Sequence, residues 1–103
     1  MSETIEKLVK TIKSRKRNNV KSSYTSFLLS KGNDHCLNKL KEEVTELEDA
    51  IKNKKNTVHE TADVIYHLLV TLESAGINFG DIIKELKKRE GTSGFEEKRN
   101  RQI

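Results

Sequence analysis

Five apolar residues, spaced alternately three and four apart, constrain the fold of this chain more than any other feature. They are Leu37, Leu40, Val44, Leu47 and Ile51. Residues three and four apart lie on the same face of an α-helix, so this run predicts a helix with one apolar stripe. The stripe has to be buried, and alternating spacing is typical of helices that pack side by side.

Helical spacing continues along the rest of the chain, and no segment has the alternation typical of a β-strand. The expected elements, in chain order, are a helix after Ser2 that runs into a basic segment ending at residue 21, a short helix within 22–32, helices over 34–52, 57–74 and 78–89, and an irregular basic tail over 92–103. Asp34 is a candidate N-cap, and Gly32 and Gly91 are candidate helix stops. The predicted fold is all-α, an antiparallel bundle of four to five helices in one domain over 1–103.

Composition favours a small core that dimerisation completes. Charged residues make up 35% of the 103 residues and hydrophobic residues 33%, so one copy has little apolar surface to bury. The formal charge of +4 would suit a polyanion, either nucleic acid or the phosphates of a nucleotide.

The single cysteine, Cys36, cannot form an internal disulfide, which fits a reducing, cytoplasmic environment. No apolar segment has the length of a signal peptide's central region or of a membrane-spanning helix. We therefore expect no membrane partner.

The segment KEEVTELEDA, residues 41–50, carries five carboxylates in ten positions. A solvated helix face stabilised by ion pairs would have Glu followed four residues later by Lys, and only Glu48 and Lys52 fit. Glu43 and Glu46, three apart, project from neighbouring turns of the predicted helix. This arrangement favours an external cation over a solvated face.

The next predicted helix is apolar nearly all round, which is typical of a central, buried helix, yet it carries Glu60 and Asp63. Unpaired carboxylates in apolar surroundings cost several kcal/mol each, so a metal ion or a basic partner is expected. Thr57 and Glu60 also match a capping box, which leaves Glu60 with two interpretations of equal weight. A capping box does not explain Asp63.

A short loop joins these two helices and makes them antiparallel neighbours, so the two carboxylate pairs should face one another. Carboxylates without His or Cys ligands describe a site for Mg²⁺, with Mn²⁺ as a substitute, and not for Zn²⁺. Magnesium held in this way usually completes its shell with water and substrate phosphates. The sequence therefore predicts a site for phosphate chemistry.

The same residues resemble the signature of the all-α, MazG-like nucleoside triphosphate pyrophosphohydrolases, in which Glu-x-x-Glu is followed by Glu-x-x-Asp. Within that superfamily the chain resembles the phosphoribosyl-ATP pyrophosphatases of histidine biosynthesis. The segments that carry this resemblance are SSYTSFLLSKG (22–32), Lys39 with the following Glu pair at 42–43, ETADVIYHLLV (60–70) and GTSGFEEK (91–98).

The resemblance implies a homodimer that hydrolyses phosphoribosyl-ATP to phosphoribosyl-AMP and pyrophosphate with Mg²⁺. The metal ligands it implies are Glu43, Glu46, Glu60 and Asp63. Glu42 is a candidate base near the metal, and with Glu43 it forms the expected catalytic pair.

Substrate contacts are expected from the residues around the carboxylates and in the tail. The candidates are Tyr24, Lys39, Ser93, Lys98 and Arg99. Tyr24 could equally be an aromatic at the edge of the core, Lys39 a plain partner of a neighbouring Glu, and the tail a solvated terminus. His67, near the Glu60 and Asp63 flank, is more typical of a structural histidine than of a catalyst.

Other functional classes explain less of the sequence. A nucleic-acid-binding module would use the basic segments but leaves the inward carboxylates unexplained, and we expect no nucleic-acid partner. A helical dimerisation module without catalysis leaves Asp63 unexplained. Within the enzyme class, the alternative is a house-cleaning pyrophosphohydrolase that acts on non-standard NTPs or dNTPs.

Overall fold

The computed structural model describes residues 2–18, 21, 23–91 and 94–101, and within these ranges every regular element is an α-helix. The helices are α1 (Glu3–Arg15), α2 (Tyr24–Lys31), α3 (Asn33–Asn53), α4 (Thr57–Ser74), α5 (Phe79–Lys88) and α6 (Gly94–Arg101). The predicted all-α fold is confirmed. None of the described helices is both long and apolar enough to cross a lipid bilayer.

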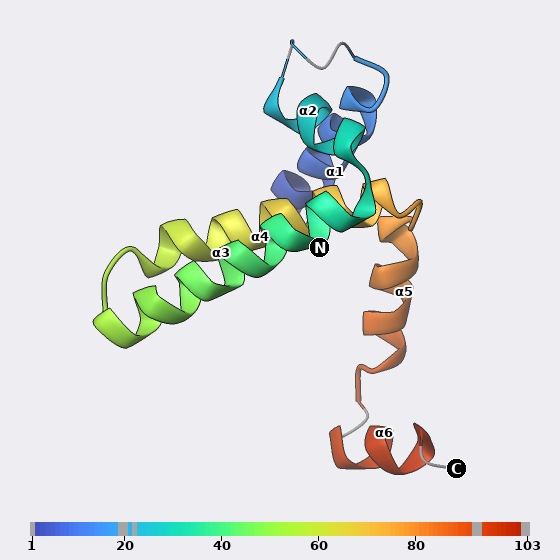
Figure 1. Cartoon of the computed structure of the whole chain (residues 1–103). Coiled ribbons are helices and arrows are strands. Elements are labelled where there is room, and N and C mark those ends of the chain that lie inside the picture. Colours follow the sequence, from blue (N-terminus) through green and yellow to red (C-terminus); the bar gives the residue numbers. More distant parts are fainter. Residues whose placement is uncertain (1, 19–20, 22, 92–93, 102–103) are drawn as a thin grey trace.

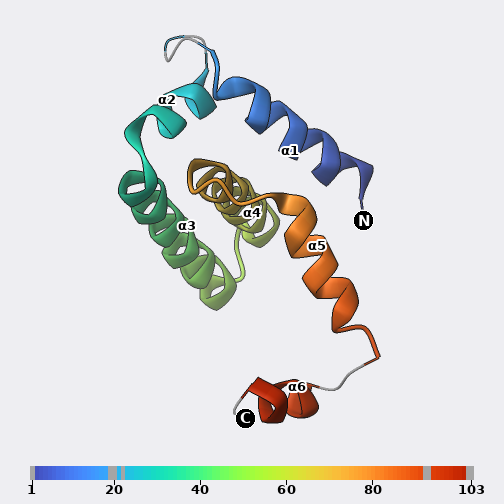
Figure 2. The same ribbon diagram turned by 90° about the vertical axis from the view of Figure 1, so that its right-hand side faces the viewer.

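The two longest helices, α3 and α4, form an antiparallel hairpin (Figure 1). Helices α1 and α2 pack against α4 at the end of the hairpin where α3 begins, and α5 leaves from the end of α4 (Figure 2). In both views α6 lies away from the hairpin. The bundle is therefore thick at one end and only two helices wide at the other.

The core lies at the thick end of this bundle. Its buried residues come from four helices and are Ile12, Leu28, Cys36, Leu69 and Val70. Phe79 at the start of α5 packs against this cluster. Cys36 is a free thiol, and its Sγ–H donates to the carbonyl of Leu28, as expected for a packing residue.

The predicted helix ends are confirmed at most positions. The hydroxyl of Ser2 accepts a hydrogen bond from the backbone N–H of Thr4, and that of Ser23 accepts one from Ser26. Gly32 ends α2 with φ of 88°, a value that strains any residue with a Cβ. The expected cap at Asp34 is wrong, because α3 already begins at Asn33, directly after Gly32, and has no side-chain cap.

The turn between α3 and α4 is tight and conformationally demanding. Lys54 and Asn56 both adopt positive φ, of 55° and 60°, which is uncommon for residues with a side chain. The carbonyl of Ala50 accepts hydrogen bonds from the N–H of Lys55 and the hydroxyl of Thr57. Thr57 is thus the first helical residue, so the alternative capping box with Glu60 does not form.

Two expectations need correction. The tail was expected to be irregular, but residues 94–101 form α6, because Glu, Lys and Arg are good helix formers and no proline interrupts them. Helix α4 was expected to be buried all round, but Val58 is 87% exposed and Ile65 and Leu68 are also exposed. Val58 lies in the first turn of α4, at the thin end of the bundle, where the neighbour of α4 is α3 alone (Figure 1).

Candidate metal centre

The hairpin brings the two predicted carboxylate pairs together. On α3, Glu43 and Glu46 lie one turn apart, and α4 presents Glu60 opposite them, with one oxygen of each of the three lying within 4.8 Å of the others. A second group at the same spacing combines Glu60 with Asp63 and His59. Glu60 belongs to both groups, so all four predicted ligands form one continuous cluster.

Part of this cluster is shielded from water and lacks hydrogen-bond donors. The side chain of Glu43 is 17% exposed. The Oε2 atoms of Glu43 and Glu60 are buried and accept no hydrogen bond. Leaving a buried acceptor unsatisfied costs about 1–3 kcal/mol, and more for a charged group. These two oxygens need a cation or a proton.

The pKa values respond to the same crowding. Burial, followed by hydrogen bonding and repulsion from Glu46, raises the pKa of Glu43 to about 7. Burial and the charge of Glu46 also raise the pKa of Glu60. Mg²⁺ and Mn²⁺ prefer carboxylate oxygens as ligands. Glu43, Glu46 and Glu60 offer such oxygens, two of them without a hydrogen bond, so these residues fit a hard divalent cation.

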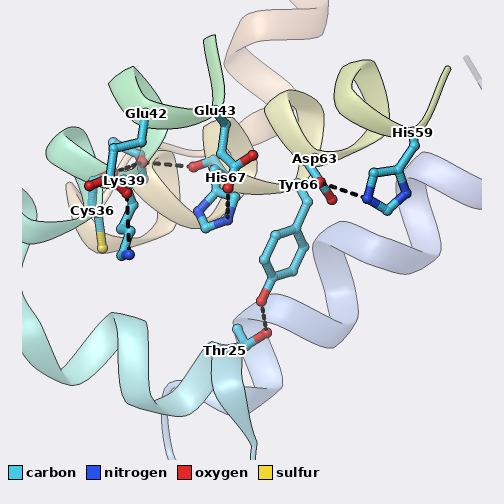
Figure 3. A network of polar contacts seen from close by, with 10 residues as sticks. Thr25, Cys36, Lys39, Glu42, Glu43, His59, Asp63, Tyr66 and His67 are labelled. Atoms are coloured by element: carbon cyan, nitrogen blue, oxygen red, sulfur yellow. Dashed lines mark hydrogen bonds and ion pairs between the residues drawn. The ribbon is translucent and has the colours of Figure 1, made fainter. Parts of the chain in front are cut away.

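His67 adjoins the cluster from within the core. It is buried on α4, and its Nε2 lies 3.7 Å from Oε1 of Glu43; the two side chains point toward one another (Figure 3). Burial lowers the pKa of His67, which favours the neutral imidazole. A neutral imidazole cannot supply the positive charge that Glu43 needs when its carboxyl group is ionised.

Lys39 and Glu42 form a pair of their own beside the cluster. Lys39 Nζ lies 3.2 Å from Oε2 of Glu42, one turn along α3, and this hydrogen bond raises the pKa of Lys39. Lys39 is therefore paired with Glu42, and among the described residues the only ion-pair partner of Glu43 is the imidazole of His67. The carboxylate of Glu42 points to solvent and belongs to neither of the two groups described above.

His59 is a site residue that the sequence analysis missed. It precedes Asp63 by one turn of α4, and its Nε2 lies 3.2 Å from Oδ2 of Asp63. The spacing of four between His59 and Asp63 was the available signal, because residues at this spacing face one another on a helix.

The remaining predicted contacts are only partly brought to the cluster. Tyr24 is exposed at the start of α2, and its ring meets the ring of His67 edge to face at 6.2 Å. Lys98 and Arg99 are exposed on α6, away from the hairpin. Ser93 lies outside the described residues.

Comparisons with known proteins point to one family. Residues 5–90 match the family described as phosphoribosyl-ATP pyrophosphohydrolase. This range contains the carboxylate cluster and all helices from α1 to α5, apart from the first residues of α1, and it excludes α6.

Several curated relatives align over most of the chain. A phosphoribosyl-ATP pyrophosphatase of Dechloromonas aromatica is 42% identical over 94% of this chain and 92% of that protein. One from Clostridium acetobutylicum is 46% identical over 85% of this chain and 82% of its own length. A histidine biosynthesis bifunctional protein of Caldanaerobacter subterraneus subsp. tengcongensis is 46% identical over 84% of this chain and 43% of that protein.

Proposed function

Because the chain belongs to the phosphoribosyl-ATP pyrophosphohydrolase family, we propose that it hydrolyses phosphoribosyl-ATP to phosphoribosyl-AMP and pyrophosphate, the second step of histidine biosynthesis. The observation that carries the proposal is the cluster of Glu43, Glu46 and Glu60, with two buried oxygens that lack a donor. Pyrophosphate release from a nucleotide requires neutralisation of phosphate charge, which such a cluster can organise through a cation.

In this proposal Glu43, Glu46, Glu60 and Asp63 hold Mg²⁺, or Mn²⁺ in its place. The ion would supply charge neutralisation on the phosphates and a lowered pKa for bound water. Glu42, exposed beside the cluster, is the proposed acceptor of the proton from the attacking water. Lys39, held by Glu42, is the proposed contact to a phosphate oxygen.

A screen for pyrophosphate release tests this function. The intact protein should release pyrophosphate from phosphoribosyl-ATP in the presence of Mg²⁺ and lose this activity with a chelator. A panel of NTPs and dNTPs, including non-standard ones, should be cleaved far more slowly. Efficient dNTP cleavage with phosphoribosyl-ATP inert would assign the house-cleaning function in its place.

We propose that the active species is a cytoplasmic homodimer. An apolar groove on the outer face of α3 is lined by Val44, Leu47 and Ile51, and Ile51 is 58% exposed. Exposed apolar residues of α4, Ile65 and Leu68 among them, add to the apolar surface of the same hairpin. A second copy of the chain would bury these stripes in the manner of paired helices.

The tail is expected to bind the phosphate of the substrate's phosphoribosyl group, which ATP lacks. Removing residues 92–103 takes away Ser93, Lys98 and Arg99, and we expect phosphoribosyl-ATP hydrolysis to fall at least about tenfold, because charge-assisted bonds to phosphate contribute about 1.5–3 kcal/mol each. Slow background hydrolysis of ATP, which lacks the extra phosphoribosyl group, should change much less. Steady-state kinetics on both substrates measures the difference.

A matched control for the tail is the double variant Lys87→Ala/Lys88→Ala at the end of α5, which removes two positive charges outside the tail. It should leave the ratio of the two activities unchanged. Equal losses on both substrates after the deletion would assign the tail to folding or dimerisation. This alternative is tested because α6 lies apart from the hairpin that carries the carboxylate cluster.

A further inference from the structure

Helix α2 exposes two aromatic rings side by side. Tyr24 is 52% exposed and Phe27 is 38% exposed. Their ring centroids lie 6.3 Å apart, with an angle of 22° between the ring planes. An aromatic side chain gains much of its stabilising effect by burial, so two neighbouring rings left in water on a helix of eight residues suggest a surface that receives a ligand.

The inner face of α2 is firmly held, which fixes the outer rings. Leu28 is fully buried, and Ser26 is buried with its hydroxyl donating to the carbonyl of Arg15. Thr25, which follows Tyr24 in the sequence, shares a hydrogen bond with the hydroxyl of Tyr66 on α4 (Figure 3). The exposed aromatic face is therefore organised before any ligand arrives.

Two histidines pack edge to face against these rings, and one of them also lies next to the candidate metal centre. The ring of His35 meets Phe27 edge to face at 6.1 Å, and His67 meets Tyr24 in the same way at 6.2 Å. His67 is also the residue whose Nε2 faces Glu43. A single imidazole thus separates the aromatic face from the proposed metal ligands.

The charges around the rings suit an anionic ligand. The ammonium group of Lys31 lies 5.2 Å from the centroid of Phe27, and Lys39 on α3, which is paired with Glu42, interacts electrostatically with Tyr24. The aromatic face therefore has lysines at its edge and a cation-binding cluster beside it. A molecule with one flat aromatic part and several phosphates matches this arrangement, because the rings can stack with the flat part while the phosphates reach the lysines and the metal centre.

From this arrangement we propose that Tyr24 and Phe27 form a stacking face for the purine base of the nucleotide substrate. The proposal rests on the proposed function, since it assigns the base of the same nucleotide whose phosphates face Glu43. The apolar groove of α3 given above to a second copy is centred on Val44, Leu47 and Ile51, whereas α2 packs near the opposite end of that helix. The two surfaces therefore take different occupants.

The first experiment is kinetic and uses the full chain with Mg²⁺. Tyr24→Leu and Phe27→Leu keep an apolar side chain but remove the ring, and each should raise KM for phosphoribosyl-ATP about tenfold, the effect of one lost base–ring stack. The kcat should stay within about twofold, because stacking acts on ground state and transition state alike. Tyr24→Phe keeps the ring and should therefore keep the wild-type KM. Leu86→Ala, which removes an α5 side chain that is 55% exposed, should not change KM either.

The second experiment measures binding without catalysis. The chain has no Trp, so Phe27→Trp introduces one indole at the proposed face. AMP should quench its fluorescence, ribose 5-phosphate should not, and Tyr24→Leu in the same background should weaken AMP binding about tenfold. Inhibition by inorganic pyrophosphate should be the same in wild type, Tyr24→Leu and Phe27→Leu.

The outcomes separate this proposal from the proposed function. Unchanged KM in both Leu variants, or equal quenching by AMP and ribose 5-phosphate, would overturn the stacking face even if hydrolysis is normal. Quenching by AMP in a protein that does not cleave phosphoribosyl-ATP would retain the stacking face and reject the proposed substrate. If the Leu variants lose helical circular dichroism, the Phe27→Trp titration alone decides.

Discussion

Replacing Glu43 by Gln should lower the rate of phosphoribosyl-ATP hydrolysis at least about 100-fold and should stabilise the metal-free protein. The first effect follows because Glu43 is a proposed ligand, and even partners outside the ligand shell contribute 10–100-fold to metal affinity or activity. The second follows because Gln has the shape of Glu without the negative charge that Glu46, Glu60 and Asp63 repel. Pyrophosphate release and thermal melting in a chelator measure the two effects.

The stabilising effect has a defined dependence on pH. The pKa of Glu43 is about 7 in the folded protein, against a reference value of 4.5. Between these pH values the folded state binds more protons than the unfolded state, so the free energy of unfolding falls as pH rises. This contribution is complete below the unfolded pKa and lost above the folded one, and it is on the order of 2–3 kcal/mol.

Metal-free wild type should therefore melt closer to Glu43→Gln at pH 5 than at pH 8, where the variant should be clearly more stable. Glu85→Gln on α5 is the control, since Glu85 is exposed, lies outside the carboxylate cluster and the α3 groove, and its only described ion pair is with Arg89 at 3.4 Å. It should change neither activity nor the pH dependence. Near-normal hydrolysis by Glu43→Gln at limiting Mg²⁺ would show that Glu43 is not a ligand.

The corresponding changes Glu46→Gln, Glu60→Gln and Asp63→Asn should also reduce turnover by orders of magnitude while folding survives. Glu60→Gln is the sharpest test of a ligand role against a structural role, because Glu60 belongs to both groups of candidate ligands. Its backbone N–H bonds to the carbonyl of Asn56 whatever the side chain, so no capping role is lost. A loss of stability without a loss of activity would contradict this reading of Glu60.

The second large effect is expected at the apolar groove of α3. Val44→Glu places a charge at the centre of the proposed dimer contact, where Val44 is 49% exposed in the single chain. Burying an unpaired charge costs several kcal/mol, so the dissociation constant of the dimer should rise at least about 100-fold. Sedimentation at micromolar concentration should show a dimer for wild type and a monomer for Val44→Glu.

Leu86→Glu on α5 serves as the control, because Leu86 has a similar exposure of 55% and lies outside that groove. It should remain dimeric. A wild-type chain that sediments as a compact, fully folded and active monomer would contradict the dimer, and the exposed stripe would then need another explanation.

The sequence was sufficient for helices α1 to α5 and for the proximity of the candidate carboxylates, because both depend on local spacing. Alternating apolar residues and caps such as Ser23 and Gly32 define helix ends within a few residues. Two pairs of carboxylates, each three apart and joined by a short turn, can meet in an antiparallel hairpin without further information. The meeting of Glu43, Glu46 and Glu60 therefore follows from their spacing on the two helices together with the short turn between them.

Features that depend on which elements become neighbours were not accessible in this way. The exposure of Val58 reflects the absence of α1 and α2 from that end of the hairpin, which no periodicity in α4 reveals. The approach of His67 to Glu43 depends on the register between α3 and α4. Helix α6 was missed because a polar segment shows no apolar period, and its helicity comes from residue propensities alone.

The turn between α3 and α4 has a consequence for how this protein can vary through evolution. The bonds to the carbonyl of Ala50 and the left-handed residues Lys54 and Asn56 fix how many residues separate Glu46 from Glu60. Side chains in the turn are exposed and can be exchanged, with glycine relieving the strain of positive φ. An inserted or deleted residue would instead offset one ligand pair from the other. Substitutions that tolerate positive φ at Lys54 and Asn56 should be accepted here, whereas changes in length should be removed by selection.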